Sequence, residues 1–218
     1  MKLKKLVLIS SIILGLTPLC RGQQIRGSHH DFTTSGKATY NSTGELCIVC
    51  HAPHGTDPTA VPLWNHNTTN KSFNTYIGYK FSLPNMGAST ISQPDGASKL
   101  CLSCHDGVSA INQFGGKFQG PSGTAQTLGN HASNLGTNLT GTHPISFVYN
   151  TTLATNDGAL KDPSTAASGL GGTIQQDLLD INGKVQCPTC HEVHDPTIFL
   201  FGRMSNAGSA LCLTCHNK

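Results

Sequence analysis

CPTCHEVH, residues 187–194, decides the fold of this chain, because its Cys-x-x-Cys-His core recurs at residues 47–51, 101–105 and 212–216. Cys-x-x-Cys alone also serves zinc ribbons and thioredoxin-like redox sites. A histidine directly after the second cysteine is typical of covalent c-type haem attachment, in which both thiols form thioethers and the imidazole ligates the iron. With 11 histidines in 218 residues, four such histidines in four motifs are not a chance result. The pattern therefore predicts haem.

Each motif predicts one covalently bound haem c, which gives four per chain. The cysteines expected to form the thioethers are Cys47, Cys50, Cys101, Cys104, Cys187, Cys190, Cys212 and Cys215. The expected proximal iron ligands are His51, His105, His191 and His216. The zinc alternative, two sites of four cysteines each, leaves the four adjacent histidines unexplained.

Residues 1–22 have the pattern of a secretory signal peptide, with three lysines in the first five residues and a largely apolar stretch over 6–16. That stretch is shorter than the about 18 apolar residues of a membrane span, and no later segment is apolar enough to be one. Cleavage before Gln23 would export the chain to the periplasm, the outer surface or the extracellular space. Lipidation of Cys20 is the alternative, although Leu19 stands where a small residue is expected.

The exported chain, residues 23–218, is poor in residues that build a core. Leu, Ile, Val and Phe account for 39 of its 196 residues, about a fifth, which is the border at which disorder is expected. Four large, flat and apolar haems would supply the missing core. We therefore expect a single haem-cored tetrahaem domain that is mostly coil, with a few short helices and little sheet. A short helix is expected at each motif, most clearly over 98–105 and 209–216, and another is possible over 173–179.

The motifs form two doublets, within residues 23–110 and 184–218. The first motif of each doublet is followed by another histidine three residues on, in HAPH and in HEVH. The second motifs also align, SKLCLSCH with SALCLTCH, which indicates an internal repeat of a haem pair. The stretch 111–183 between the doublets is rich in Gly, Asn, Thr and Ser, and is expected to wrap the haems as a linker and to deliver ligands.

Seven histidines lie outside the motifs, which is enough to give every iron a second imidazole. The expected distal ligands are His30, His54, His143 and His194, with His66, His131 and His29 as alternates. Of these, His54 and His194 take the same place in the repeat, from which each can reach a neighbouring haem.

The other histidines differ in their context. Because Pro144 holds the preceding residue extended, His143 is expected to project from the chain. His66 is a candidate distal ligand because the nearby Trp64 is a natural group for stacking on haem. His30 is expected to reach the first haem or a haem of a neighbouring molecule, whereas His131 is interpreted as a surface histidine.

Charge argues against binding of nucleic acid. Without the signal peptide, 10 Lys and Arg face 11 Asp and Glu, and ionised haem propionates would add negative charge. No basic stripe of the kind that phosphate binding requires is present. Redox proteins, extracellular electron acceptors or further copies of the chain are the expected partners.

The motifs and their surroundings resemble those of bacterial multihaem cytochromes with doubled Cys-x-x-Cys-His motifs. Within that group they resemble the OmcE-like tetrahaem outer-surface cytochromes, which polymerise into extracellular haem nanowires. The segments that carry the resemblance are SHHDF (28–32), ELCIVCHAPHG (45–55), PLWNH (62–66), CLSCHDG (101–107), THPISF (142–147), QCPTCHEVHD (186–195) and LCLTCHNK (211–218). The resemblance implies bis-histidine haems in a continuous stack, and one iron ligated by a histidine of the adjacent subunit. His30 is the candidate for that inter-subunit ligand.

The expected function is electron transfer by a carrier that is not an enzyme. About 50 residues per haem and two histidines per iron suit a conductor of electrons. An extracellular filament is the leading form and a soluble periplasmic shuttle is the alternative. A multihaem reductase would need one iron with an open position, whereas here the available histidines outnumber the irons. A scaffold whose haems serve only as a core is the remaining possibility.

Overall fold

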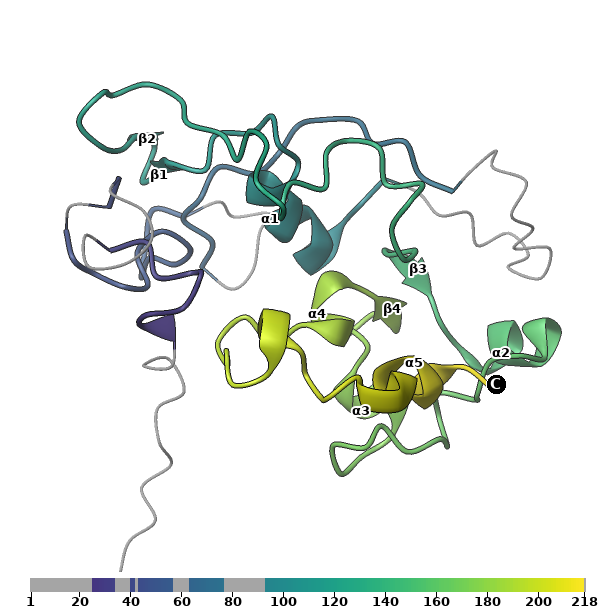
Figure 1. Cartoon of the computed structure of the whole chain (residues 1–218). Helices are drawn as coiled ribbons and strands as arrows, with labels where there is room; N and C mark the ends of the chain where they lie inside the picture. Colours follow the sequence, from purple (N-terminus) through teal and green to yellow (C-terminus); the bar gives the residue numbers. More distant parts are fainter. Residues whose placement is uncertain (1–24, 34–39, 42, 57–62, 77–92, 218) are drawn as a thin grey trace, which may run out of the picture.

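A computed structural model describes residues 25–33, 40–41, 43–56, 63–76 and 93–217. The predicted signal peptide, with Cys20, lies outside the described residues. The helices are α1 (Gly96–His105), α2 (Thr151–Asp157), α3 (Ile174–Asp177), α4 (Cys187–Cys190) and α5 (Ala210–Cys215), with 3-10 turns η2 (Phe199–Phe201) and η3 (Ala207–Ser209). The strands are β1 (Gln113–Phe114), β2 (Lys117–Phe118), β3 (Phe147–Val148) and β4 (Lys184–Val185). The remainder is coil (Figure 1), so the expectation of mostly coil, short helices and little sheet is confirmed.

Three of the four motifs lie on helices, as expected. The helices α1, α4 and α5 carry the second, third and fourth motifs, and α3 lies within the stretch 173–179. A capping box between Thr173 and Gln176 begins α3. The first motif is different, because it forms a single turn in which the His51 amide donates to the Cys47 carbonyl at 2.8 Å. Gly44, with φ +72°, and Pro53 prevent a helix from extending in either direction.

The strands form two short antiparallel sheets, one local and one between distant segments of the chain. In the first, β1 and β2 form a hairpin whose turn is Gly115-Gly116, and both glycines have the positive φ that tight hairpin turns require. In the second, β3 pairs with β4, with Phe147 opposite Val185. This second pairing brings the chain before α2 alongside the chain that enters the third motif.

The stretch 111–183 is more structured than a wrapping linker. It contains β1, β2, β3, α2 and α3, and it supplies most of an apolar cluster of Tyr149, Leu153, Ala154, Ile174, Leu178 and Val185. Cys215 of the fourth motif packs against this cluster. The described residues therefore form an apolar core of protein side chains. The sequence predicts a core made of haems and does not predict this cluster.

A buried polar junction holds α1 against α4, which Figure 1 shows below it. The Cys187 amide donates to Ser98 Oγ at 2.9 Å, and the Ser98 amide donates to Gln186 Oε1 at 3.3 Å. Gln186 Nε2 donates to Asp95 at 3.0 Å, and Asp95 also pairs with Lys184. Ser98 and Gln186 are almost fully buried, so these bonds fix the second motif beside the third.

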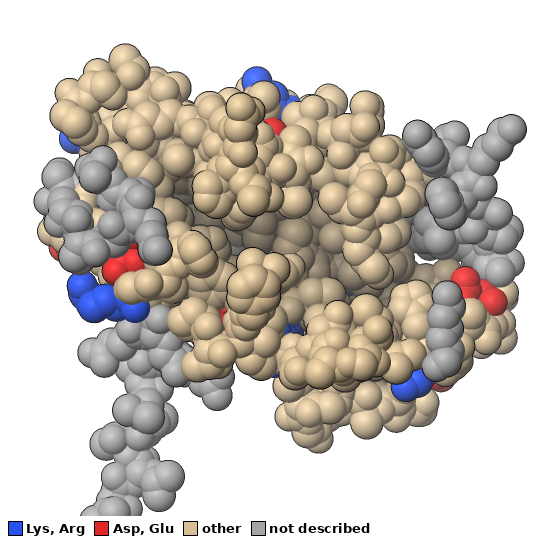
Figure 2. All heavy atoms as spheres, viewed as in Figure 1, with Lys and Arg blue, Asp and Glu red and all other residues tan. Residues whose placement is uncertain are grey.

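Charged side chains are sparse on the face shown in Figure 2, and neither sign gathers into a stripe. The same face is hollowed across its middle. Over the ranges that the structure describes, none of the helices has the length and apolar character needed to cross a membrane.

Candidate functional site

The structure brings predicted distal histidines next to motif histidines in three pairs. The distances between ring centroids are 6.2 Å for His51 and His194, 6.1 Å for His105 and His30, and 6.4 Å for His216 and His143. Each pair joins a motif histidine to a histidine far away in the sequence. The His51–His194 pair also links the first doublet to the second.

These separations fit a metal ion held between two imidazoles. A metal–imidazole bond is about 2.0 Å long and the ring centre lies about 1.2 Å behind the nitrogen, so two rings on opposite sides of one ion have centroids about 6.3 Å apart. A haem iron takes four ligands from the porphyrin and two from the protein. Among the residues that the structure describes, no three or more His, Cys, Asp or Glu side chains converge on one point, as a zinc site of protein ligands would require. Each of the three donor sets present is a pair of imidazoles.

Hydrogen bonds at the second ring nitrogen orient several of these imidazoles. Nδ1 of His105 lies 2.9 Å from the Ser133 carbonyl oxygen, and Nδ1 of His143 lies 2.8 Å from that of Pro144. A carbonyl oxygen only accepts, so each Nδ1 carries the proton and Nε2 keeps the lone pair that a metal needs.

The third and fourth oriented imidazoles belong to the second doublet. Nδ1 of His191 lies 2.9 Å from the Leu200 carbonyl oxygen, and Nδ1 of His194 lies 3.3 Å from Glu192 Oε1. Arg203 lies 3.7 Å from the other carboxylate oxygen of Glu192. Hydrogen-bonded outer partners of this kind are usual for metal-ligating histidines, since they fix both the tautomer and the ring direction.

His30 differs from its expected position. We expected it to reach the first haem or a neighbouring molecule, but its ring lies beside His105 of the second motif in the same chain. The ring of Phe201 stacks on it, with centroids 4.7 Å apart. Burial, followed by the nearby charge of His105, lowers the pKa of His30 to about 4. At neutral pH the ring is therefore in the neutral form that binds a metal.

The alternates are placed differently from the paired histidines. His66 is buried, with Nδ1 2.8 Å from the Asn67 carbonyl oxygen and Nε2 3.2 Å from that of Ile111 and 3.5 Å from Cys104 Sγ, so each ring nitrogen has a polar neighbour in the protein. His131 is exposed, and its Nδ1 lies 2.8 Å from Ser133 Oγ. His29 is exposed beside His30.

One motif histidine, His191, has no second imidazole stacked or edge-on to it among the residues the structure describes. His54 is exposed and takes part in none of the three pairs. In the sequence repeat, His54 follows His51 by three residues as His194 follows His191.

The thiols of the second and third motifs are in direct contact. A hydrogen bond between Cys101 and Cys187 raises the pKa of Cys101 and lowers that of Cys187. The α1–α4 junction described above accounts for this contact, because Ser98 bonds to the Cys187 amide. The haem edges bonded to these two sulfurs would therefore lie next to each other.

Neighbouring thiols also connect the other motifs. Burial raises the pKa of Cys50 to about 12 and raises that of Cys104, and the charge of Cys50 adds to the effect at Cys104. Burial raises the pKa of Cys215 to about 11, with a further contribution from the charge of Cys190. The motifs whose thiols affect each other in this way are consecutive in the sequence, the first with the second and the third with the fourth.

The outer motifs are more open than the inner ones. Cys47 of the first motif and Cys212 of the fourth are exposed, whereas Cys101 and Cys187 are half-buried. A hollow of about 390 Å³ lies at the fourth motif and is lined by Gly208, Ser209, Cys212, Leu213 and His216. At the first motif, the indole N–H of Trp64 is buried without a hydrogen-bond partner in the described structure, and its ring lies edge-on to His51. An apolar hollow and an unused donor both suit a bound haem with polar propionates.

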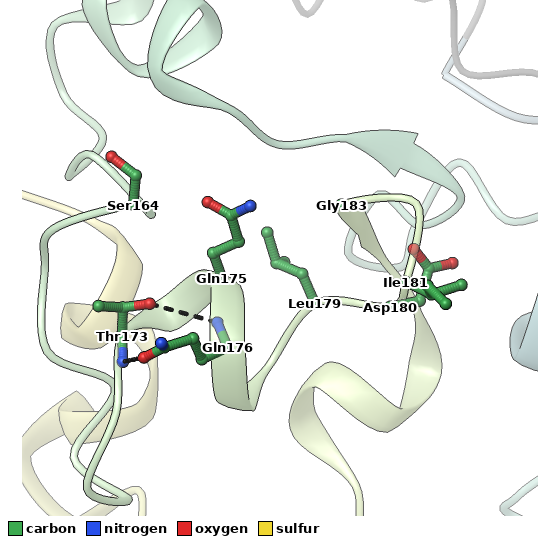
Figure 3. A pocket seen from close by; sticks show the side chains of 8 residues that line it. All are labelled: Ser164, Thr173, Gln175, Gln176, Leu179, Asp180, Ile181 and Gly183. Carbon is green, nitrogen blue, oxygen red and sulfur yellow. Dashed lines mark hydrogen bonds between the residues drawn. The ribbon is translucent and has the colours of Figure 1, made fainter.

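A second hollow, of about 560 Å³, lies between α3 and the turn before β4 (Figure 3). Its lining contains neither Cys nor His, and consists of Ser164, Thr173, Gln175, Gln176, Leu179, Asp180, Ile181 and Gly183. Asp180, the one ionisable side chain in this lining, accepts hydrogen bonds from the amides of Asn182 and Lys184 at 2.8 and 2.9 Å. The hollow therefore lacks the side chains of the predicted haem sites.

Sequence reasoning missed the groups that orient the imidazoles. Ser133, Pro144 and Leu200 act through backbone carbonyls, which leave no signal in residue type. Phe201 could have been noticed in the sequence, because it is an aromatic residue shortly after a predicted distal ligand. Its contact with His30 could not, because the two residues are far apart in the sequence.

In comparisons with known proteins, neither a family model nor a curated protein matches the chain.

Proposed function

We propose that this chain is a tetrahaem c-type cytochrome that transfers electrons. The observation that carries the proposal is that three of the four motif histidines face a second histidine at 6.1–6.4 Å, the separation expected across a bis-ligated iron. Four Cys-x-x-Cys-His motifs supply the covalent attachment. A bound haem supplies one-electron chemistry, since its iron exchanges a single electron between two oxidation states.

The chain's own residues favour a carrier over an enzyme. Two imidazoles on one iron leave no position for a substrate. Carbonyl oxygens of Ser133, Pro144 and Leu200 hold the rings in fixed directions, which limits the rearrangement that accompanies gain or loss of an electron. The effects of Cys50 on the pKa of Cys104 and of Cys190 on that of Cys215, together with the α1–α4 junction, support an order of the four sites that follows the sequence. Electrons would then pass from the first motif to the fourth or in reverse.

We propose His54 as the second imidazole for His191. The pair His51–His194 supports this assignment, because the repeat gives His54 and His191 the reciprocal relation. The proposal replaces the expectation that His30 bridges two subunits, since His30 faces His105 within the chain.

We further propose that copies of the chain join end to end into an extracellular filament. The exposed cysteines of the first and fourth motifs support this, because the outer sites of one copy are open to those of another. The second candidate is a soluble periplasmic shuttle, which the three histidine pairs within one chain favour. Negative-stain microscopy of the secreted protein separates the two, since monomers at high concentration would refute the filament.

Carbon monoxide tests the proposed electron-carrier function. We expect the reduced wild-type protein to keep its visible spectrum when carbon monoxide is added, because every iron has two imidazoles. A substantial spectral change at one haem would reveal an open position. That result would favour the reductase alternative.

A further inference from the structure

The turn that follows the third motif has an unusual backbone. Leu200 and Phe201 are consecutive residues with φ values of 56° and 58°. Non-glycine residues avoid this left-handed region because the Cβ atom approaches the backbone, and such residues concentrate where function requires them. The chain places two side chains there although it uses glycine at many other positive-φ positions.

The strained turn is tied to the third motif by its backbone. The Leu200 carbonyl oxygen lies 2.9 Å from Nδ1 of His191, and the Phe201 carbonyl accepts from the Glu192 amide at 2.7 Å. The Arg203 amide donates to the Cys190 carbonyl at 2.9 Å. The left-handed backbone thus directs the Leu200 carbonyl at the ring of a motif histidine.

The side chain of Phe201 reaches a different site. It is buried, and its ring stacks on His30 at 4.7 Å with an angle of 18° between the planes. His30 faces His105 of the second motif. One turn therefore contacts an imidazole at each of two neighbouring sites, through a carbonyl oxygen at the third and an aromatic ring at the second.

The two strained residues differ in what their side chains contribute. The side chain of Leu200 is largely exposed, which leaves its carbonyl as the contact with the site. Gly202, which follows, leaves little room, since a Cβ there would meet Ile198 Cγ2 at 2.9 Å and the Met204 carbonyl oxygen at 3.2 Å. The close packing at Gly202 fixes the end of the turn.

We propose that residues 199–201 form a positioning turn that orients the imidazoles of His191 and His30 and thereby sets the ligand fields and reduction potentials of the second and third haems together. The inference rests on the proposed function. Leu200 and Phe201 are positioning residues, because they act through the two histidines. A hydrogen bond at Nδ1 makes His191 a stronger donor, which favours the oxidised iron.

The test compares variants of the full haem-loaded protein by electron paramagnetic resonance and by redox titration. We expect Phe201→Leu, which keeps an apolar side chain but loses the stacked ring, to shift the g-values of one haem. Phe201→Tyr keeps the ring and should match the wild type. In Leu200→Pro, the proline φ near −65° is incompatible with the turn, and we expect the reduction potential of one haem to rise. In Leu200→Gly, glycine accepts the positive φ and keeps the direction of the carbonyl, so we expect no change in potential.

Haem count per chain and circular dichroism show that each variant is folded and loaded. Wild-type g-values and potentials in both Phe201→Leu and Leu200→Pro, with four haems bound, would overturn the positioning turn while leaving electron transfer intact. A wild-type protein without covalent haem would instead refute the proposed function itself.

Discussion

Replacing His194 with alanine should open one of the four irons to carbon monoxide. The ring centroids of His194 and His51 lie 6.2 Å apart, with an angle of 25° between the ring planes. Glu192 orients the His194 ring, because its Oε1 lies 3.3 Å from Nδ1. Without this imidazole the iron at the first motif keeps only its proximal ligand. We expect the reduced variant to bind carbon monoxide at about one haem per chain, with the other three haems unchanged. Difference spectra and the stoichiometry of carbon monoxide binding measure this.

His131→Ala is the matched control for this variant. His131 is also an exposed histidine outside the motifs, but its Nδ1 bonds to Ser133 and it pairs with no motif histidine. The control should keep the wild-type spectrum. A His194→Ala protein that still binds no carbon monoxide would contradict the His51–His194 pair.

Replacing His54 with alanine should open a second, different iron. His54 is the proposed second imidazole for His191, whose Nδ1 lies 2.9 Å from the Leu200 carbonyl oxygen. We expect the isolated variant to bind about one carbon monoxide per chain, and the double variant with His194→Ala to bind about two, because the ligands serve separate irons.

His29→Ala is the control for His54, since both are exposed and neither belongs to the three observed pairs. In the isolated chain it should leave all four irons closed. The reverse outcome is that His29→Ala exposes one iron to carbon monoxide and prevents assembly of the copies, while His54→Ala does neither. That outcome would show that a histidine of a neighbouring copy completes the site at His191.

The sequence predicts local features of this protein better than its long-range pairings. Helices at the last three motifs and at 173–179 follow from local patterns, and the structure confirms them. The first motif forms only a turn because Gly44 and Pro53 limit it. The apolar cluster around Tyr149 and Ile174 escaped prediction, since its members come from separate segments that meet only in the folded chain.

The histidine pairs show the same limit. Residue type and repeat position identify His143 and His194 as ligand candidates, but only the folded chain shows which motif histidine each of them faces. The nearby Trp64 made His66 a candidate ligand, yet each of its ring nitrogens lies within hydrogen-bond distance of a backbone carbonyl oxygen. Contacts made by backbone atoms have no signature in the sequence.

The intact mass of the mature protein, secreted from a host that attaches c-type haem, tests the central proposal most directly. We expect the polypeptide mass plus four haems under denaturing conditions, because thioether bonds survive denaturation. The eight motif cysteines should then resist alkylation. A mature chain that carries no covalent haem, or that retains eight free or zinc-bound thiols, would contradict the tetrahaem cytochrome.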